Sequence, residues 1–70
     1  MKVYAPFAGI VRYTVAENAT VATGDQIAAI EAIKMELPIT APGPGRVSKL
    51  ACTPFQDVIG GDELLTIEEI

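Results

Sequence analysis

The stretch Val3-Tyr4-Ala5-Pro6-Phe7-Ala8-Gly9-Ile10-Val11 recurs 36 residues later as Ile39-Thr40-Ala41-Pro42-Gly43-Pro44-Gly45-Arg46-Val47. Both copies read Ala-Pro, then Gly, then Val. A second pair follows 37 residues apart, as Val21-Ala22-Thr23-Gly24-Asp25-Gln26-Ile27 and Val58-Ile59-Gly60-Gly61-Asp62-Glu63-Leu64. Two copies are too few for a solenoid, but they can cover each other's apolar faces. The repeat therefore predicts two interlocked halves of one domain, residues 1–70.

The runs within each half have the character of strands. They are short and rich in Val, Ile, Thr and Tyr, and Ala-Pro, Gly-Asp and Pro-Gly-Pro-Gly separate them, with no sustained helical period. We therefore expect an all-β domain, a small sandwich or a flattened barrel. Gly24 and Gly61, each followed by Asp, are predicted to occupy equivalent turns that need a positive φ. Pro6 and Pro42 are predicted at strand ends, because proline cannot donate to a ladder.

Charge and hydropathy exclude two classes of partner. Five Lys and Arg against nine Asp and Glu give the 70-residue chain a net charge of −4, which argues against nucleic acid, because that binding rests on clustered cations. No apolar run approaches the roughly 20 residues that span a bilayer, so no membrane insertion is expected. An acidic surface instead suits transient docking to basic faces of proteins.

Cys52 is the only cysteine, and the chain has no histidine. A structural zinc site, a Cys-His nucleophile pair and a disulfide framework are therefore excluded, so we expect no metal site and no catalytic residue. We interpret Cys52 as a small buried hydrophobe. A single thiol suits a reducing compartment, and we expect the protein to be cytoplasmic.

Lys34 stands between two apolar runs that are predicted to be strands, Ile27–Ile30 and Leu37–Ile39. We expect it at the tip of a tight connection, with its amine in water. Large apolar residues, Ile33 and Met35, flank it where a turn tip would normally avoid them, which suggests a recognition surface. The alternatives are a lysine that only solubilises the tip and a methionine that only packs on the hairpin.

The repeat also predicts where Lys34 lies in the molecule. An offset of 36 or 37 residues from Lys34 leads to position 70 or 71, the end of the sequence. The hairpin should therefore lie at one end of the domain and the chain ends at the other.

The segment Glu31-Ala32-Ile33-Lys34-Met35 resembles the Glu-Ala-Met-Lys-Met attachment motif of biotinyl domains, the biotin carboxyl carrier family. The resemblance covers essentially the whole chain, through the Ala-Pro-x-x-Gly-x-Val entry at Ala5–Val11, Gly24-Asp25, Ala41-Pro42 and Gly61-Asp62. It implies a flattened β-barrel, a barrel-sandwich hybrid of two four-stranded antiparallel sheets related by a pseudo-twofold.

The same resemblance implies a function as a biotin carboxyl carrier. A biotin protein ligase would join biotin covalently to Lys34, with Ile33 and Met35 beside the attachment. Biotin carboxylase would then load the cofactor, and carboxyltransferase would pass the carboxyl group on, in a biotin-dependent carboxylase or decarboxylase. The domain itself would be a carrier without catalytic activity, since the reactive centre belongs to the cofactor.

Two features of this chain modify that picture. Ile33 replaces the usual methionine and is stiffer, because it is β-branched. The stretch Tyr13–Thr20 carries no inserted thumb, so the domain resembles the thumbless type. Glu31, three residues before Lys34, is either a ligase contact or a solvated strand residue.

Two other functions stay open. A lipoyl-type acyl carrier domain has the same fold, but its usual motif is Asp-Lys-Ala. An unmodified barrel-sandwich interaction module would make Lys34 incidental.

Overall fold

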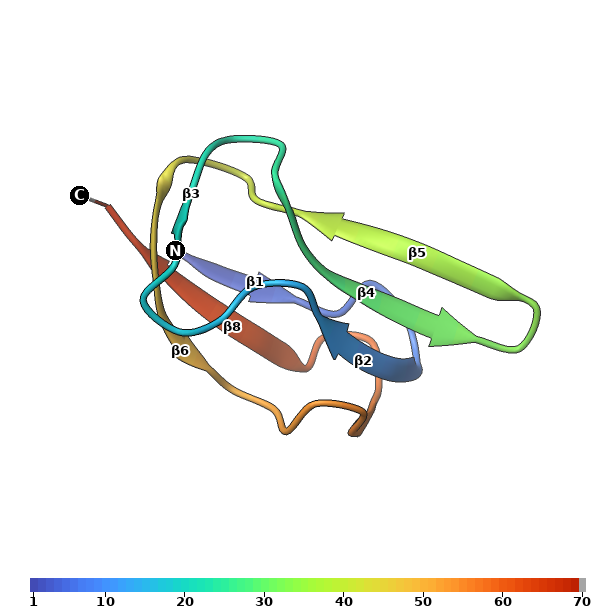
Figure 1. Ribbon diagram of the computed structural model, residues 1–70. Coiled ribbons are helices and arrows are strands. Elements are labelled where there is room, and N and C mark those ends of the chain that lie inside the picture. The colour runs from blue at the N-terminus through green and yellow to red at the C-terminus, as the bar shows by residue number, and fades with distance from the viewer. Residues whose placement is uncertain (70) are drawn as a thin grey trace.

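The computed structural model describes residues 1–69, which form β-strands joined by turns and contain no helix (Figure 1). The eight strands are β1 (Lys2–Tyr4), β2 (Gly9–Tyr13), β3 (Thr20–Val21), β4 (Gln26–Ala32), β5 (Met35–Thr40), β6 (Gly45–Leu50), β7 (Asp57–Val58) and β8 (Glu63–Glu68). The all-β prediction is confirmed.

The strands form two four-stranded sheets, in the orders β1-β8-β6-β3 and β5-β4-β2-β7, and every pairing is antiparallel. The repeat in the sequence relates these orders strand by strand. A shift of 36 or 37 residues converts β1, β2, β3 and β4 into β5, β6, β7 and β8. Applied to one sheet order, this exchange produces the other, so the predicted pseudo-twofold is confirmed.

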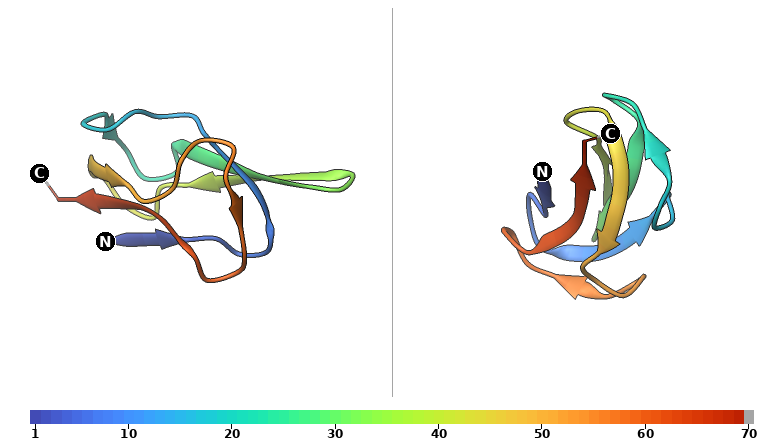
Figure 2. Two further views of the ribbon diagram at one scale, coloured as in Figure 1. Left: turned by 90° about the horizontal axis from the view of Figure 1, so that it is seen from below. Right: turned by 90° about the vertical axis from the view of Figure 1, so that its left-hand side faces the viewer.

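The two sheets face each other as a sandwich and do not close into the expected flattened barrel (Figure 2). All strand pairs found in residues 1–69 lie within one sheet or the other. The edge strands explain this, because β3 and β7 are two residues long. Ladders this short cannot continue the hydrogen bonding around the molecule.

The inner faces of both sheets supply the core. Strand side chains alternate between faces, so every second residue points inward. Val11 and Ile30 pair within one sheet and Val47 and Ile67 within the other, and all four are fully buried. Cys52, predicted to be a buried hydrophobe, packs against this core but is only partly buried. Burial of these apolar groups is the main stabilising contribution in a domain this small.

The Gly-Asp turns are equivalent in the two halves. Gly24 has a φ of 88° and Gly61 a φ of 94°, which confirms the predicted positive φ. Asp25 Oδ2 accepts a hydrogen bond from the Ala22 amide at 2.8 Å, and Asp62 Oδ2 accepts one from the Ile59 amide at 2.9 Å. In both halves the carboxylate thus accepts from the amide three residues earlier, and it satisfies an amide that lies outside the strands.

Proline lies where the sequence predicts it. Pro6 follows β1 and Pro42 follows β5, each just outside a strand that forms an edge of its sheet. Pro38 lies within the edge strand β5, where the missing amide proton removes no central ladder bond.

The molecule is elongated, with principal extents of 36 × 19 × 18 Å. The β4–β5 hairpin projects at one end of the long axis, while the start of β1 and the end of β8 lie at the other (Figure 1). This confirms the predicted separation of hairpin and chain ends for residues 1–69. Position 70, the repeat counterpart of Lys34, lies outside the described residues.

Candidate functional site

The site is the β4–β5 hairpin, the most extensively paired unit of its sheet. The ladder runs from Gln26 opposite Thr40 to Ala32 opposite Met35, with one irregularity near Ala28. At that irregularity the side-chain Nε2 of Gln26 donates a hydrogen bond to the Ala28 carbonyl at 3.4 Å. Because Ala32 and Met35 form the last pair of the ladder, only two residues remain between them to form the turn.

Ile33 and Lys34 form this two-residue turn. Lys34 has a φ of 62°, in the left-handed region, whereas Ile33 is not among the residues with positive φ. These signs are those of a type II turn, in which only the second central residue needs a positive φ. A β-branched residue strongly disfavours that region. The side chain of Ile33 therefore explains why Lys34 alone adopts the left-handed conformation.

The turn displays its side chains to solvent. Ile33 is 91% exposed and Met35 52% exposed, although both are large and apolar. Lys34 is also exposed, and no ion pair found in residues 1–69 involves it. The structure thus brings the three predicted site residues together at the tip, with all three exposed to solvent.

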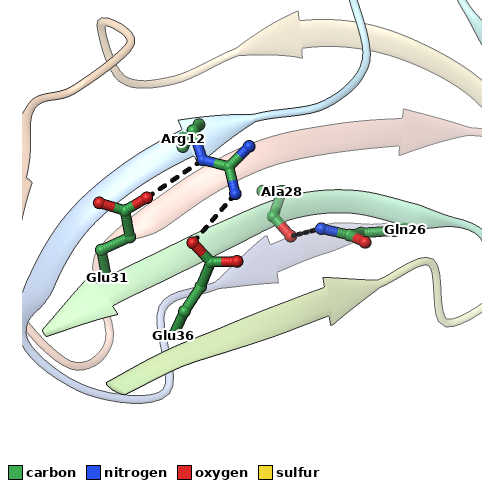
Figure 3. Close-up of polar contacts among 5 residues, drawn as sticks. All are labelled: Arg12, Gln26, Ala28, Glu31 and Glu36. Atoms are coloured by element: carbon green, nitrogen blue, oxygen red, sulfur yellow. Dashed lines mark hydrogen bonds and ion pairs between the residues drawn. The ribbon is translucent and has the colours of Figure 1, made fainter. Parts of the chain in front are cut away.

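An arginine that the sequence reasoning missed supports the hairpin close to its turn (Figure 3). Glu31 on β4 lies directly opposite Glu36 on β5, and like charges in that position repel. Arg12 on β2 contacts both, with Nε 3.2 Å from Glu31 Oε1 and Nη2 3.0 Å from Glu36 Oε2. One guanidinium therefore ties three neighbouring strands together.

The contacts also affect ionisation. The hydrogen bond and the positive charge of Arg12 lower the pKa of Glu36. In return, the hydrogen bond and charge of Glu36 raise the pKa of Arg12, with a smaller contribution from Glu31. Glu31 is thus half-exposed and ion-paired. Only the register of β2 against β4 reveals this network, and the sequence gives no register.

The geometry at the tip fits a covalently attached group. An exposed primary amine at the end of a projecting turn can enter the active site of another protein without disturbing the core. In residues 1–69, no group of three or more His, Cys, Asp or Glu is arranged to hold a metal ion. Within the same residues, no helix is long and apolar enough to cross a membrane.

Comparison with known proteins identifies relatives of this arrangement. Residues 1–67 match the family model described as biotin-requiring enzyme. The biotin-dependent acyl-coenzyme A carboxylase alpha3 subunit of Mycobacterium leprae (strain TN) is 40% identical over 67 residues. That match covers 94% of this chain and 11% of the subunit. The chain thus spans about a tenth of the length of this relative.

Two solved structures contain a region with the same fold as this chain. A single-chain, multi-domain long-chain acyl-CoA carboxylase matches with a TM-score of 0.86 and 35% identity, over 93% of this chain and 6% of that one. The ectoine utilization protein EutE (DoeB) from Ruegeria pomeroyi matches with a TM-score of 0.79 and 20% identity, over 99% of this chain and 22% of that one. The second likeness shows the fold alone. Because the family match spans residues 1–67 of 70, the chain belongs to the family of biotin-requiring enzymes.

Proposed function

We propose that Lys34 is the attachment residue for biotin and that this domain is the carrier of a biotin-dependent carboxylase. The observation that supports it most directly is the exposed Lys34 amine at the hairpin tip, without an ion pair in residues 1–69 and between the exposed Ile33 and Met35. The relatives named as acyl-CoA carboxylases add support for biotin over a lipoyl group.

Attachment needs a ligase, because a lysine amine carries a proton at neutral pH. A biotin protein ligase would remove that proton and present the biotin carboxyl group as an adenylate. The Lys34 Nζ atom would form an amide bond to the carboxyl carbon, and the bond from that carbon to the phosphate oxygen would break to release AMP. The loss of the lysine charge changes the net charge of the chain from −4 to −5.

Bound biotin supplies a ring nitrogen that carries a carboxyl group between two enzyme sites. The chain contributes placement and reach. Ile33 and Met35 give the partner enzymes an apolar surface beside the tether, and the hairpin ladder holds Lys34 away from the body of the domain. Tethering raises the effective concentration of the group at each site. The partners would be biotin carboxylase and carboxyltransferase.

Intact-mass spectrometry tests the attachment. Co-expression with a biotin protein ligase should add the mass of one biotinyl group, and avidin should bind the product. Lys34→Arg should abolish both signals, while Lys49→Arg, an exposed lysine on β6, should keep both. A bare Lys34 in a cell that modifies a known biotinyl domain would contradict the proposal. The added mass also distinguishes biotin from a lipoyl group.

A further inference from the structure

A shallow groove lies beside the hairpin and plays no part in holding Lys34. Its volume is about 830 Å³, and most of its lining is apolar, including Ile10, Ala32 and Ile33. Gly9 lines it where β2 and β4 approach closely, because a Cβ on Gly9 would lie 2.5 Å from the Glu31 carbonyl oxygen. The groove thus continues the exposed apolar surface of the hairpin tip along its side.

The internal repeat gives this groove a counterpart at the opposite end. Gly45, Val21 and Thr20 line the counterpart, in the positions that Gly9, Val58 and Asp57 take beside the hairpin. Its volume is about 400 Å³, close to half as large.

The counterpart groove is lined by an apolar side chain that the hairpin groove lacks. Met1 lies there against Gly43, with its Cε 2.8 Å from where a Cβ on Gly43 would stand. Leu37 is the repeat equivalent of Met1, and it does not line the groove beside the hairpin. Met1 therefore narrows the counterpart groove, whereas the groove beside the hairpin is about twice as large and has Ile10 and Ile33 in its lining.

The charged residues in the lining of the hairpin groove indicate which kind of partner would bind there. The lining of the hairpin groove includes two carboxylates, Glu31 and Asp57, and no cation. Glu31 is already paired with Arg12, whereas no ion pair found in residues 1–69 involves Asp57. Biotinylation would remove the positive charge of Lys34 from this end. The modified domain would then attract a basic surface more strongly than the unmodified one.

We infer that this groove docks biotin carboxylase, by receiving an apolar side chain of that enzyme while a basic residue beside it faces Asp57. The inference rests on the proposed function. An enzyme that binds ATP and bicarbonate, both anions, must place cations around its active site, which complements the free carboxylate of Asp57. The ligase meets the domain while Lys34 is still cationic, so it gains less from the same contact.

The experiment uses the biotinylated chain as the varied substrate of biotin carboxylase. Modification is first verified by mass, and bicarbonate-dependent ADP release is then measured. Ala8→Arg places a long cation in the groove at an exposed position. Thr20→Arg places the same charge in the counterpart groove, also at an exposed position, and serves as the matched control.

We expect Ala8→Arg to raise KM about tenfold, equivalent to about 1.4 kcal/mol, with kcat unchanged. Thr20→Arg should leave both constants within about twofold of wild type, because it changes the charge far from the hairpin. A KM for Ala8→Arg no higher than that for Thr20→Arg would overturn the inference.

A second variant does not depend on how the fold tolerates a long side chain. Asp57→Asn keeps the shape of the groove and removes its free charge, so KM should rise about threefold at low salt and converge on wild type at high salt. If Asp57→Asn and wild type have equal KM values at every salt concentration, the inference is overturned while the carrier function stays intact. A chain whose Lys34 stays unmodified would overturn both, and the mass measurement recognises that case separately.

Discussion

Arg12 and Glu36 form a 3.0 Å ion pair that passes over the strand between them. Arg12 lies on β2 and Glu36 on β5, and β4 separates the two strands in the sheet. The pair therefore connects the outermost strand of the hairpin directly to the body of the domain. Because Arg12 lowers the pKa of Glu36, the contribution of this pair to stability can be tested by varying the pH.

Replacing Arg12 should change the acid side of the stability profile. The folded pKa of Glu36 is depressed by Arg12, so this group contributes stability above its unfolded pKa and loses it as the pH falls through the folded value. Arg12→Gln should therefore be less stable than wild type at neutral pH, and the two should converge in acid. Urea denaturation at a series of pH values measures the difference.

Arg46→Gln provides the control for that experiment. Arg46 pairs with Glu68 at 3.4 Å in the other sheet, at the opposite end of the molecule. An identical pH dependence for the two variants would contradict the role assigned to the Arg12–Glu36 pair.

Tyr13 should produce a separate loss of stability in alkali. Its hydroxyl donates to the Leu64 carbonyl at 2.6 Å and accepts from the Cys52 amide at 3.2 Å, and burial raises its pKa to about 12. A raised pKa means that the neutral form stabilises the fold below the unfolded pKa, about 10, and that this contribution is lost as the pH rises toward 12.

Tyr13→Phe should remove this alkaline slope and cost about 1–3 kcal/mol at neutral pH, because two polar groups lose their partner. Unfolding in urea between neutral pH and pH 12 compares the two proteins. If the phenylalanine variant shows the same slope, the slope belongs to another group.

Adjacent glycines in the second Gly-Asp turn should respond in opposite directions. Gly61 has a φ of 94°, and nothing lies within 4 Å of a Cβ built on it, so Gly61→Ala meets only the conformational penalty. We expect a loss of about 1–2 kcal/mol. Gly60 lacks a positive φ, and its Cβ would lie 3.5 Å from the nearest atom.

Gly60→Ala should therefore be neutral or stabilise by up to about 1 kcal/mol, since alanine restricts the unfolded chain. Midpoints of chemical denaturation compare the two variants directly. Equal destabilisation by both would show that packing, and not backbone conformation, decides the effect.

Ile33→Met tests the position where this chain departs from the usual attachment motif. Ile33 is 91% exposed, so the change should alter the free energy of unfolding by less than about 0.5 kcal/mol. The ligase should modify Lys34 in both proteins. Methionine is more pliable, so the modified variant should have the higher kcat/KM with biotin carboxylase.

Met35→Ile makes the reverse exchange on the other side of Lys34 and should lower the same kcat/KM. If Ile33→Met instead lowers it, the β-branched side chain is a specific contact of the partner enzyme.

The repeat allowed much of the fold to be predicted, because paired motifs such as Gly24-Asp25 and Gly61-Asp62 place equivalent turns at equivalent points. The two apolar runs that flank Lys34 predicted it at a hairpin tip, and the repeat predicted that this tip lies far from the chain ends. Whether the two sheets close into a barrel was not predictable, because closure depends on how short β3 and β7 are once paired. Hairpin position follows from local sequence, whereas sheet closure is a property of the whole assembly.

The surroundings of the tip were less accessible to sequence reasoning. Arg12 meets Glu31 and Glu36 only through the register of three strands. The exposure of Ile33, in contrast, was predicted from its place beside Lys34 at the turn tip, and the structure confirms it. The turn conformation of Lys34 follows in part from that neighbour, through backbone sterics that a motif does not express.

The elongated shape gives the domain the geometry of a lever. Its long axis measures 36 Å, with the hairpin at one end and the start of β1 at the other (Figure 1). A rotation about the β1 end would sweep Lys34 through an arc comparable with that length, while every strand pair stayed intact. The distance that the hairpin tip travels is therefore set by the length of the domain, and no strand pair has to break for the tip to move.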